Sequence, residues 1–150
     1  MPTMLDEKDR SILAMFTEDG RRSVVDVANR LDIPRATVQE RMQRLLSSGV
    51  IRKFVAIPDY SKLGEGVTAY VLVSFTNDED VSQEALAEQV SRIQGVFQVS
   101  LISGEWDILL KVRGSSVEQV GKLVVGKLRT MNGIEKTQTF FSFREVKEGF

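Results

Sequence analysis

The sequence predicts an α+β chain in which a helical first third precedes strands and helices in the order βαββαβ. Between residues 5 and 48, apolar residues recur at intervals of three and four, the spacing of amphipathic helices. From residue 67 onward, stretches of alternating apolar residues indicate strands, and two helical stretches separate them. The segment Ser61–Gly66, which holds two glycines, lies between the two patterns and is the expected boundary.

The first third contains three expected helices. The first runs from about Leu5 to Thr17 and has an acidic first turn, which suits a helix N-terminus. The second begins after the capping residue Ser23 and carries the stripe Val24, Val27, Ala28 and Leu31. After a break at residues 32–34, a third helix at 35–48 has the inner stripe Val38, Met42 and Leu45. Two short helices joined by a tight turn form a helix-turn-helix, whose second helix can lie in the major groove of DNA.

Positive charge is concentrated in the same region. Residues 20–53 hold eight cations and three anions, whereas the whole chain has a net charge of −1. A basic stretch on one part of an otherwise neutral chain is typical of a surface that meets nucleic acid. The alternative is a solvated helix face, which is what most charge runs are.

The next segment, Val50–Ile57, has the pattern of a strand and is closed by Pro58-Asp59. We interpret it as the wing or linker of a winged helix-turn-helix. The expected organisation is therefore a helix-turn-helix DNA-binding domain at 1–50, a linker strand and hinge at 51–66, and a ferredoxin-like domain at 67–150.

The ferredoxin-like domain is expected to have strands at 67–75, 96–103, 106–113 and 134–145, with helices near 86–93 and 117–131. Two helices cover only one face of a sheet, yet the strands carry apolar residues on both faces. Phe97, Val99 and Leu101 alternate with Val96 and Ile102, and Phe141 and Phe143 alternate with Phe140. We therefore expect another copy of the chain to bury the second face.

Composition excludes several classes of protein. The chain has no cysteine and no histidine, which removes thiol chemistry, the commonest general base and the commonest metal ligand. No cofactor and no metal are therefore expected, and the carboxylates Glu105 and Asp107 are the best that an enzyme hypothesis can offer. No apolar window reaches the roughly 18 residues of a membrane span, and no secretion signal is evident, so a cytoplasmic protein without a membrane partner is expected.

Four sequence patterns together resemble the Lrp/AsnC (leucine-responsive, feast-famine) family of transcriptional regulators. They are the opening helix Leu5-Asp6-x-x-Asp9-x-x-Ile12-Leu13, the turn Asp19-Gly20-Arg21, the helix from Val38 through Arg41-Met42-x-Arg44-Leu45 to Gly49-Val50-Ile51, and the hairpin Gly104-Glu105-Trp106-Asp107. One departure is Pro34, which stands where the family usually has a serine cap. The resemblance implies an ACT-like (RAM) effector and oligomerisation domain, a dimer that assembles further, commonly to an octamer, and an amino-acid effector.

The candidate DNA-binding residues lie on the third helix and just after it. Gln39 and Gln43 can pair with adenine and Glu40 can accept from cytosine, while Ala36 and Thr37 lie near the N-terminal end that enters the groove. The cations Arg35, Arg44, Arg52 and Lys53 are expected to contact phosphates, which position a protein without reading sequence. Arg41 borders the inner stripe, and we expect it to be structural and paired to a carboxylate.

The candidate effector site is the Gly104–Asp107 turn. Backbone N–H groups near Gly104 could hold the carboxylate of a free amino acid, and Asp107 or Glu105 could hold its ammonium group. Trp106 could wall the site, and the resemblance adds the last strand, on which Thr137 and Thr139 are candidate hydroxyl donors. In the simpler alternative, Gly104 only makes a tight turn and Asp107 only bonds backbone. The competing function is an architectural DNA-binding protein without effector. A strongly basic chain would favour that function, and this chain has a net charge of −1.

Overall fold

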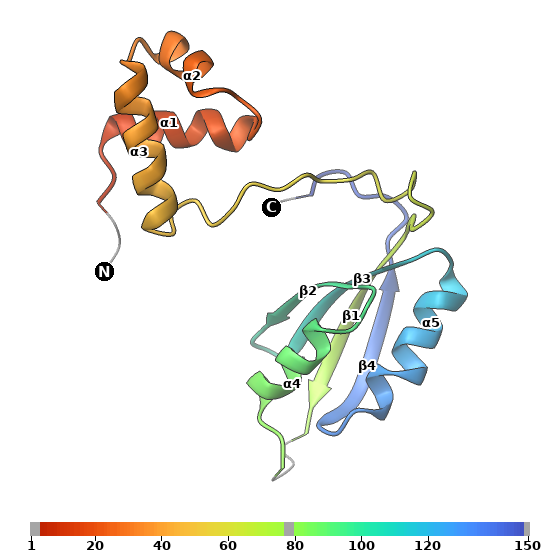
Figure 1. Ribbon diagram of the computed structural model, residues 1–150. Helices are drawn as coiled ribbons and strands as arrows, with labels where there is room; N and C mark the ends of the chain where they lie inside the picture. Colours follow the sequence, from red (N-terminus) through yellow and green to blue (C-terminus); the bar gives the residue numbers. More distant parts are fainter. Residues whose placement is uncertain (1–3, 77–79, 149–150) are drawn as a thin grey trace. The chain divides into compact units, whose positions relative to one another are not determined.

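The computed structural model of the protein describes residues 4–76 and 80–148 and divides the chain between Ile57 and Pro58 into two compact units (Figure 1). The first unit holds the helices α1 (Glu7–Glu18), α2 (Val24–Leu31) and α3 (Arg35–Ser47). The second holds β1 (Val67–Phe75), α4 (Gln83–Ser91), β2 (Val96–Leu101), β3 (Ile108–Gly114), α5 (Val117–Gly126), the short 3-10 helix η1 (Leu128–Thr130) and β4 (Ile134–Phe141). The α+β class and the βαββαβ order are confirmed.

The three helices of the first unit form as their sequences predict. The Asp6 side chain caps α1 in a reciprocal box with Asp9, and the Ser23 hydroxyl accepts from the backbone N–H of Asp26 at the start of α2. Helix α3 begins at Arg35 after Pro34 and has no side-chain cap. The apolar stripes meet in one core, formed by Ile12, Phe16, Val27, Ala28, Ile33, Val38, Leu45 and Ile51.

The expected strand at 50–57 is wrong, and the first unit shows no wing among the residues described. Residues 52–59 are irregular. A strand needs a neighbour to receive its backbone hydrogen bonds, and no strand among the described residues pairs with this segment. Two contacts hold the start of the segment instead. The Ile51 N–H donates to the Leu45 carbonyl at 2.9 Å, and the Phe54 ring packs edge-on against Phe16 at 5.7 Å between ring centroids.

The second unit is a four-stranded antiparallel sheet in the order β2-β3-β1-β4. Its core lies between the sheet and α4 and α5, where the alternate residues of β1 and β3 meet the inner sides of both helices. Strand β3 begins at Ile108 rather than Trp106 because the Asp107 carboxylate accepts the N–H of Phe75 and belongs to the turn. Strand β4 ends at Phe141, four residues earlier than expected.

The distribution of apolar residues over the two sheet faces differs from the expected one. The register pairs Val99 with Leu110 and Phe141 with Ala69, which places both on the helix-covered side. A bulge between Val96 and Gln98 interrupts the alternation of β2, so Phe97 packs with Tyr60 instead. The open face, as we call the side without helices, therefore mixes apolar and charged residues: Tyr70, Leu72, Leu109, Phe140, Lys111 and Arg113.

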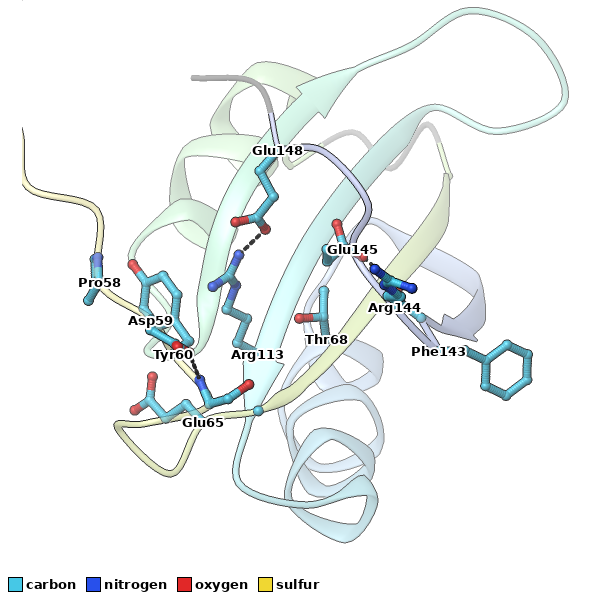
Figure 2. A pocket seen from close by; sticks show the side chains of 13 residues that line it. Pro58, Asp59, Tyr60, Glu65, Thr68, Arg113, Phe143, Arg144, Glu145 and Glu148 are labelled. Carbon is cyan, nitrogen blue, oxygen red and sulfur yellow. Dashed lines mark hydrogen bonds and ion pairs between the residues drawn. The ribbon is translucent and has the colours of Figure 1, made fainter. Parts of the chain in front are cut away.

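The C-terminal segment after β4 lies against the open face (Figure 2). Glu145 accepts from the Tyr70 hydroxyl at 2.8 Å and from Lys111 at 3.2 Å, and Glu148 binds Arg113. Hydrogen bonds from Ser142, Tyr70 and then Lys111 to the charged carboxylate lower the pKa of Glu145 from 4.5 to about 2. The sequence alone did not show that residues 142–148 turn back in this way.

The expected hinge at 51–66 is divided between the two units. Its second part, residues 58–66, belongs to the second unit. The Arg113 guanidinium lies over the Tyr60 ring, 3.9 Å from its centroid, and the Tyr60 ring packs edge-on against Phe97 at 4.9 Å between ring centroids. These contacts fix the residues that immediately precede β1.

Candidate functional sites

Helix α3 presents the predicted row of polar residues to solvent. Val38 and Leu45 are buried in the core, and this orientation leaves the opposite side of the helix exposed. The exposed side carries Ala36, Gln39, Glu40 and Gln43, while Thr37 is half-buried at its edge. Neither glutamine makes a side-chain hydrogen bond within the residues described, so both amides are available to an external partner.

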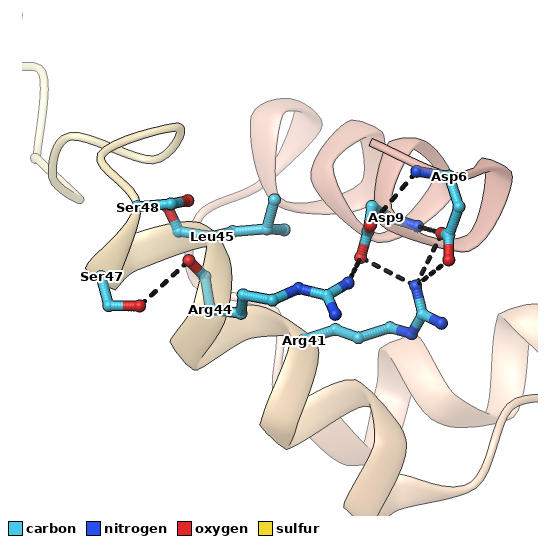
Figure 3. Close-up of polar contacts among 7 residues, drawn as sticks. All are labelled: Asp6, Asp9, Arg41, Arg44, Leu45, Ser47 and Ser48. Atoms are coloured by element: carbon cyan, nitrogen blue, oxygen red, sulfur yellow. Dashed lines mark hydrogen bonds and ion pairs between the residues drawn. The ribbon is translucent and has the colours of Figure 1, made fainter. Parts of the chain in front are cut away.

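A buried carboxylate attaches this helix to α1 (Figure 3). The side chain of Asp9 is only 3% exposed, and its Oδ1 accepts from Arg41 Nη1 at 2.8 Å and from Arg44 Nη2 at 2.6 Å. Arg41 also reaches both oxygens of Asp6 at 2.6 Å. The structural role predicted for Arg41 is confirmed. Sequence reasoning missed Asp9, because acidic residues in a first turn are ordinary partners of the helix dipole.

The candidate phosphate-binding cations fall into two groups. The Arg44 guanidinium is engaged by Asp9, although 53% of its side chain is exposed. Arg35, Arg52 and Lys53 are exposed and form no ion pair within the described part of the chain. By contrast, Arg22 pairs with Glu18 and Arg30 pairs with Asp26, each four residues away in sequence. Among the candidate phosphate-binding cations, the unpaired positive charge therefore lies at the start of α3 and directly after its end, and Arg21 is a further exposed cation without an ion pair in the described residues.

In the second unit, the Gly104–Asp107 turn is held by the backbone of β1. The Asp107 N–H donates to the Val73 carbonyl at 3.0 Å, and the Asp107 carboxylate accepts from the Phe75 N–H at 2.7 Å. Asp107 thus has the backbone role of the simpler alternative, with β1 as partner. Gly104 has a φ of +128°, and a Cβ atom there would meet nothing within 4 Å, so its backbone is open to a ligand.

The structure brings most of the other predicted effector residues to the same end of the sheet. Thr137 pairs with Val73, the residue bound by Asp107, whereas Thr139 lies two pairs further along. Glu105 is exposed and Trp106 half-buried. Sequence reasoning missed Lys136, whose ammonium lies 5.0 Å from the centroid of the Trp106 ring. Lys136 adds a cation for a carboxylate, while Glu105 offers an anion for an ammonium group.

Residues 4–76 and 80–148 hold neither a cluster of metal-ligating side chains nor a membrane-spanning helix. No group of three or more acidic side chains, the only metal-ligating types in this composition, is placed to hold a metal ion there. No helix within these residues is long and apolar enough to cross a membrane.

Comparison with known proteins matches both units. The family model of the Lrp/AsnC ligand binding domain matches residues 68–150, and that of a winged helix-turn-helix DNA-binding domain matches residues 5–52. An HTH-type transcriptional regulator of Pyrococcus horikoshii is 43% identical over 148 residues, 99% of each chain. The proline dehydrogenase transcriptional activator of Rhizobium radiobacter is 31% identical over 144 residues, 96% of this chain and 92% of the activator.

Solved structures show the same fold. A transcriptional regulator of Neisseria meningitidis, in complex with L-methionine, superimposes with a TM-score of 0.90 at 25% identity and covers 97% of this chain and 94% of its own. AsnC of E. coli superimposes with a TM-score of 0.86 at 18% identity, over 98% of this chain and 97% of its own. The chain therefore belongs to the Lrp/AsnC family, as the sequence motifs indicated, and is a DNA-binding transcriptional regulator with a ligand-binding domain.

Proposed function

We propose that the protein reads specific DNA sequences through α3 and that an amino acid bound at the Gly104–Asp107 turn changes its DNA binding and its assembly. The observation that supports this most directly is the turn itself. Its backbone is open at Gly104, Glu105 follows directly, and the Lys136 ammonium lies against Trp106 of the same turn, so the turn offers opposite charges. A free amino acid carries both charges on one carbon. The methionine bound to the Neisseria regulator supports the same class of ligand.

The competing function is an architectural DNA-binding protein without effector. The match of residues 68–150 to a ligand-binding domain favours regulation over architecture. Calorimetry against the free amino acids discriminates the two, because an architectural protein would give no saturable heat with any of them.

Sequence reading is expected to depend on the two exposed glutamines of α3. Replacing Gln39 or Gln43 with alanine should relax specificity at one base pair in each half-site, at a cost of about 1–3 kcal/mol if the pair with adenine is bidentate. Sites selected from random DNA by the wild type and by each variant provide the measurement. Gln94→Ala is the matched control, since Gln94 is an exposed glutamine of the second unit. Identical selected sites for all four proteins would place the reading surface elsewhere.

The ligand response is expected to depend on the open backbone at Gly104. Gly104→Val should weaken amino-acid binding by about tenfold or more, since a branched side chain blocks approach to charge-assisted N–H donors. DNA binding without effector should stay nearly unchanged. Gly64→Val is the matched control, because Gly64 also has a positive φ, of +80°, and open space around its Cβ position. Equal amino-acid affinity in both variants would contradict this location. Gly104 is a cleaner test than Asp107, whose carboxylate also supports β1.

Self-association is expected to use the open face of the sheet. Phe140 is 48% exposed there, next to Tyr70 in the register, and the C-terminal segment binds only part of this face. A second copy would bury these residues, consistent with a dimer that assembles further, to an octamer if this chain follows the family. Light scattering at micromolar concentration should show no monomer for the wild type and a smaller species for Phe140→Glu. A stable wild-type monomer would contradict the expectation.

A further inference from the structure

The exposure of the C-terminal segment, residues 142–148, repeats every three residues. Ser142, Glu145 and Glu148 are half-buried against the sheet, and the residues between them are exposed. One of the exposed rows is apolar: Phe143 is fully exposed and Val146 is 87% exposed. Figure 2 shows Phe143 pointing away from the sheet. The segment therefore has a polar inner row, which binds its own sheet, and an apolar outer row, which is open to a partner.

The inner row holds the segment in place. Glu145 accepts from the Tyr70 hydroxyl at 2.8 Å and pairs with Lys111 at 3.2 Å, and Glu148 pairs with Arg113. The side chains of Lys111 and Arg113 are only 12% and 8% exposed. Ion pairs that are shielded from water in this way are screened by salt much less than exposed ones. The outer row is therefore fixed before any partner binds, and docking loses little further conformational freedom.

The outer row continues the apolar surface of the open face. Phe140, which lies on that face and is 48% exposed, precedes Phe143 and Val146 at the same interval of three residues. One exposed apolar residue is ordinary on a protein surface, whereas several close together mark an interaction site. Aromatic side chains in particular are enriched where proteins meet, and they contribute much of the binding energy. The three residues together therefore indicate a protein partner.

The charges of the segment favour a second copy of the chain as that partner. Lys111 and Arg113 would give the open face a positive charge, and two such faces would repel each other. Glu145 and Glu148 supply two negative charges that compensate them. A two-fold interface brings the same surface of both copies together, so this surface has to be complementary to itself. The compensated face meets this condition, whereas the bare face does not.

DNA is the alternative partner of the segment. Arg144 and Lys147 form its second exposed row, and exposed cations can contact phosphates. Such contacts depend on charge alone and leave the apolar row of Phe143 and Val146 without a function. A second copy accounts for the inner row and the apolar row together, so the observations favour it.

We propose that the C-terminal segment is part of the surface through which two copies of the chain associate. Its inner row compensates the charge of the open face, and Phe143 and Val146 pack against the second copy. Because a two-fold interface is reciprocal, each copy contributes its own segment. This role rests on the self-association proposed above and identifies residues outside the sheet that carry it.

Sedimentation of the full-length protein over nanomolar to micromolar concentrations tests the outer row. Phe143→Ser should raise the dissociation constant of the dimer by about tenfold or more, the loss expected for a central aromatic contact. Phe143 is fully exposed in the single chain, so this substitution leaves the fold of that chain intact. Phe143→Leu, which keeps an apolar side chain, should associate more tightly than Phe143→Ser. Val125→Ser is the matched control, since Val125 is 59% exposed on α5, on the helix-covered side, and should associate as the wild type does.

The inner row is tested by its charge. Replacing Glu145 and Glu148 together with glutamine leaves Lys111 and Arg113 without their counter-charges, so the two faces repel each other. We expect the dissociation constant of this variant to exceed that of the wild type and to fall as salt is added, because salt screens like charges. The wild type should show a smaller effect of salt.

The outcomes distinguish the role of the segment from the self-association on which it rests. A wild type that is a monomer throughout contradicts both. If Phe140→Glu dissociates the dimer and Phe143→Ser does not, the open face associates without the segment, and only the role of the segment is overturned. The same holds if Val125→Ser weakens the dimer as much as Phe143→Ser does. It also holds if Phe143→Ser lowers DNA affinity alone, which would identify DNA as the partner.

Discussion

Asp9→Ala is expected to destabilise the DNA-binding unit by about 2–3 kcal/mol and to weaken binding to every DNA sequence. Removing one partner of a fully buried ion pair costs about 3–5 kcal/mol, because the remaining charge is left without compensation. The cost here is lower because 19% of Arg41 and 53% of Arg44 is exposed, so both guanidinium groups can turn toward water. DNA binding falls because Asp9 holds both arginines of α3 and thereby fixes the helix against α1.

Denaturant unfolding of the full-length protein measures the first effect, and titration with DNA measures the second. Asp26→Ala is the matched control: Asp26 forms an exposed ion pair with Arg30 within α2, and such pairs contribute about 0.3–0.5 kcal/mol. If Asp9→Ala unfolds at the same denaturant concentration as Asp26→Ala, the buried carboxylate does not hold α3 in place.

The same cluster predicts how the unit responds to acid. The hydrogen bond from Arg41 and the backbone N–H of Asp9 lower the pKa of Asp6 from 3.8 to about 2. A carboxylate whose pKa is lower in the folded protein stabilises that state above its unfolded pKa, and the contribution disappears as the pH falls through the folded pKa. The contribution of Asp6 should therefore be constant at neutral pH and be lost between about pH 4 and pH 2. Asp6→Asn should remove that part of the pH dependence.

Replacing Arg35, Arg52 and Lys53 together with glutamine is expected to lower DNA affinity by about two to three orders of magnitude at roughly 0.1 M salt. Each neutralised phosphate contributes about −0.9 to the slope of log K against log salt, which corresponds to nearly tenfold in affinity at that concentration. The slope should become shallower by about 2.7 if all three residues contact phosphates. Specific and random DNA should lose affinity equally, since phosphate contacts carry no sequence information.

A second triple variant with the same change in charge provides the control. Arg92, Lys127 and Arg129 are exposed cations of the second unit without an ion pair in the residues described. Their replacement with glutamine should leave the salt slope nearly unchanged. An equal loss of affinity in both triple variants would mean that net charge, rather than a contact surface at α3, governs DNA binding.

The sequence predicted those parts of the molecule that depend on local pattern. Caps and apolar stripes located α1, α2 and α3, and period-two alternation located the four strands, because both signals arise from residues close together in the chain. The prediction failed where the structure of a segment depends on residues far away in the sequence. Residues 50–57 alternate like a strand but have no neighbouring strand in the part of the chain that the structure describes. The bulge at Phe97 moved one residue to the other face, which alternation alone cannot reveal.

Much the same distinction applies to the candidate sites. The exposed polar residues of α3 were predicted from the 3.6-residue period of a helix, which is a local property of the sequence. Arg44 lies 35 residues from its partner Asp9, and Arg113 lies 35 residues from its partner Glu148. Trp106 and Lys136 are 30 residues apart. No rule based on short sequence spacing could identify these pairs. Asp107 was predicted as an anion for a ligand's ammonium group, with backbone bonding as the alternative, and the fold directs its carboxylate to the backbone N–H of Phe75 in β1.

One measurement tests the central claim most directly: DNA affinity with and without each free amino acid, on a site that the protein itself has selected from random sequence. We predict that the selected site is a pseudo-palindrome with half-sites one helical turn or a multiple apart. At least one amino acid should change the affinity, and DNA should change the affinity for that amino acid by the same factor, as linkage requires. If the selected site is unsymmetrical and none of the amino acids alters binding, the protein is not the amino-acid-responsive regulator proposed.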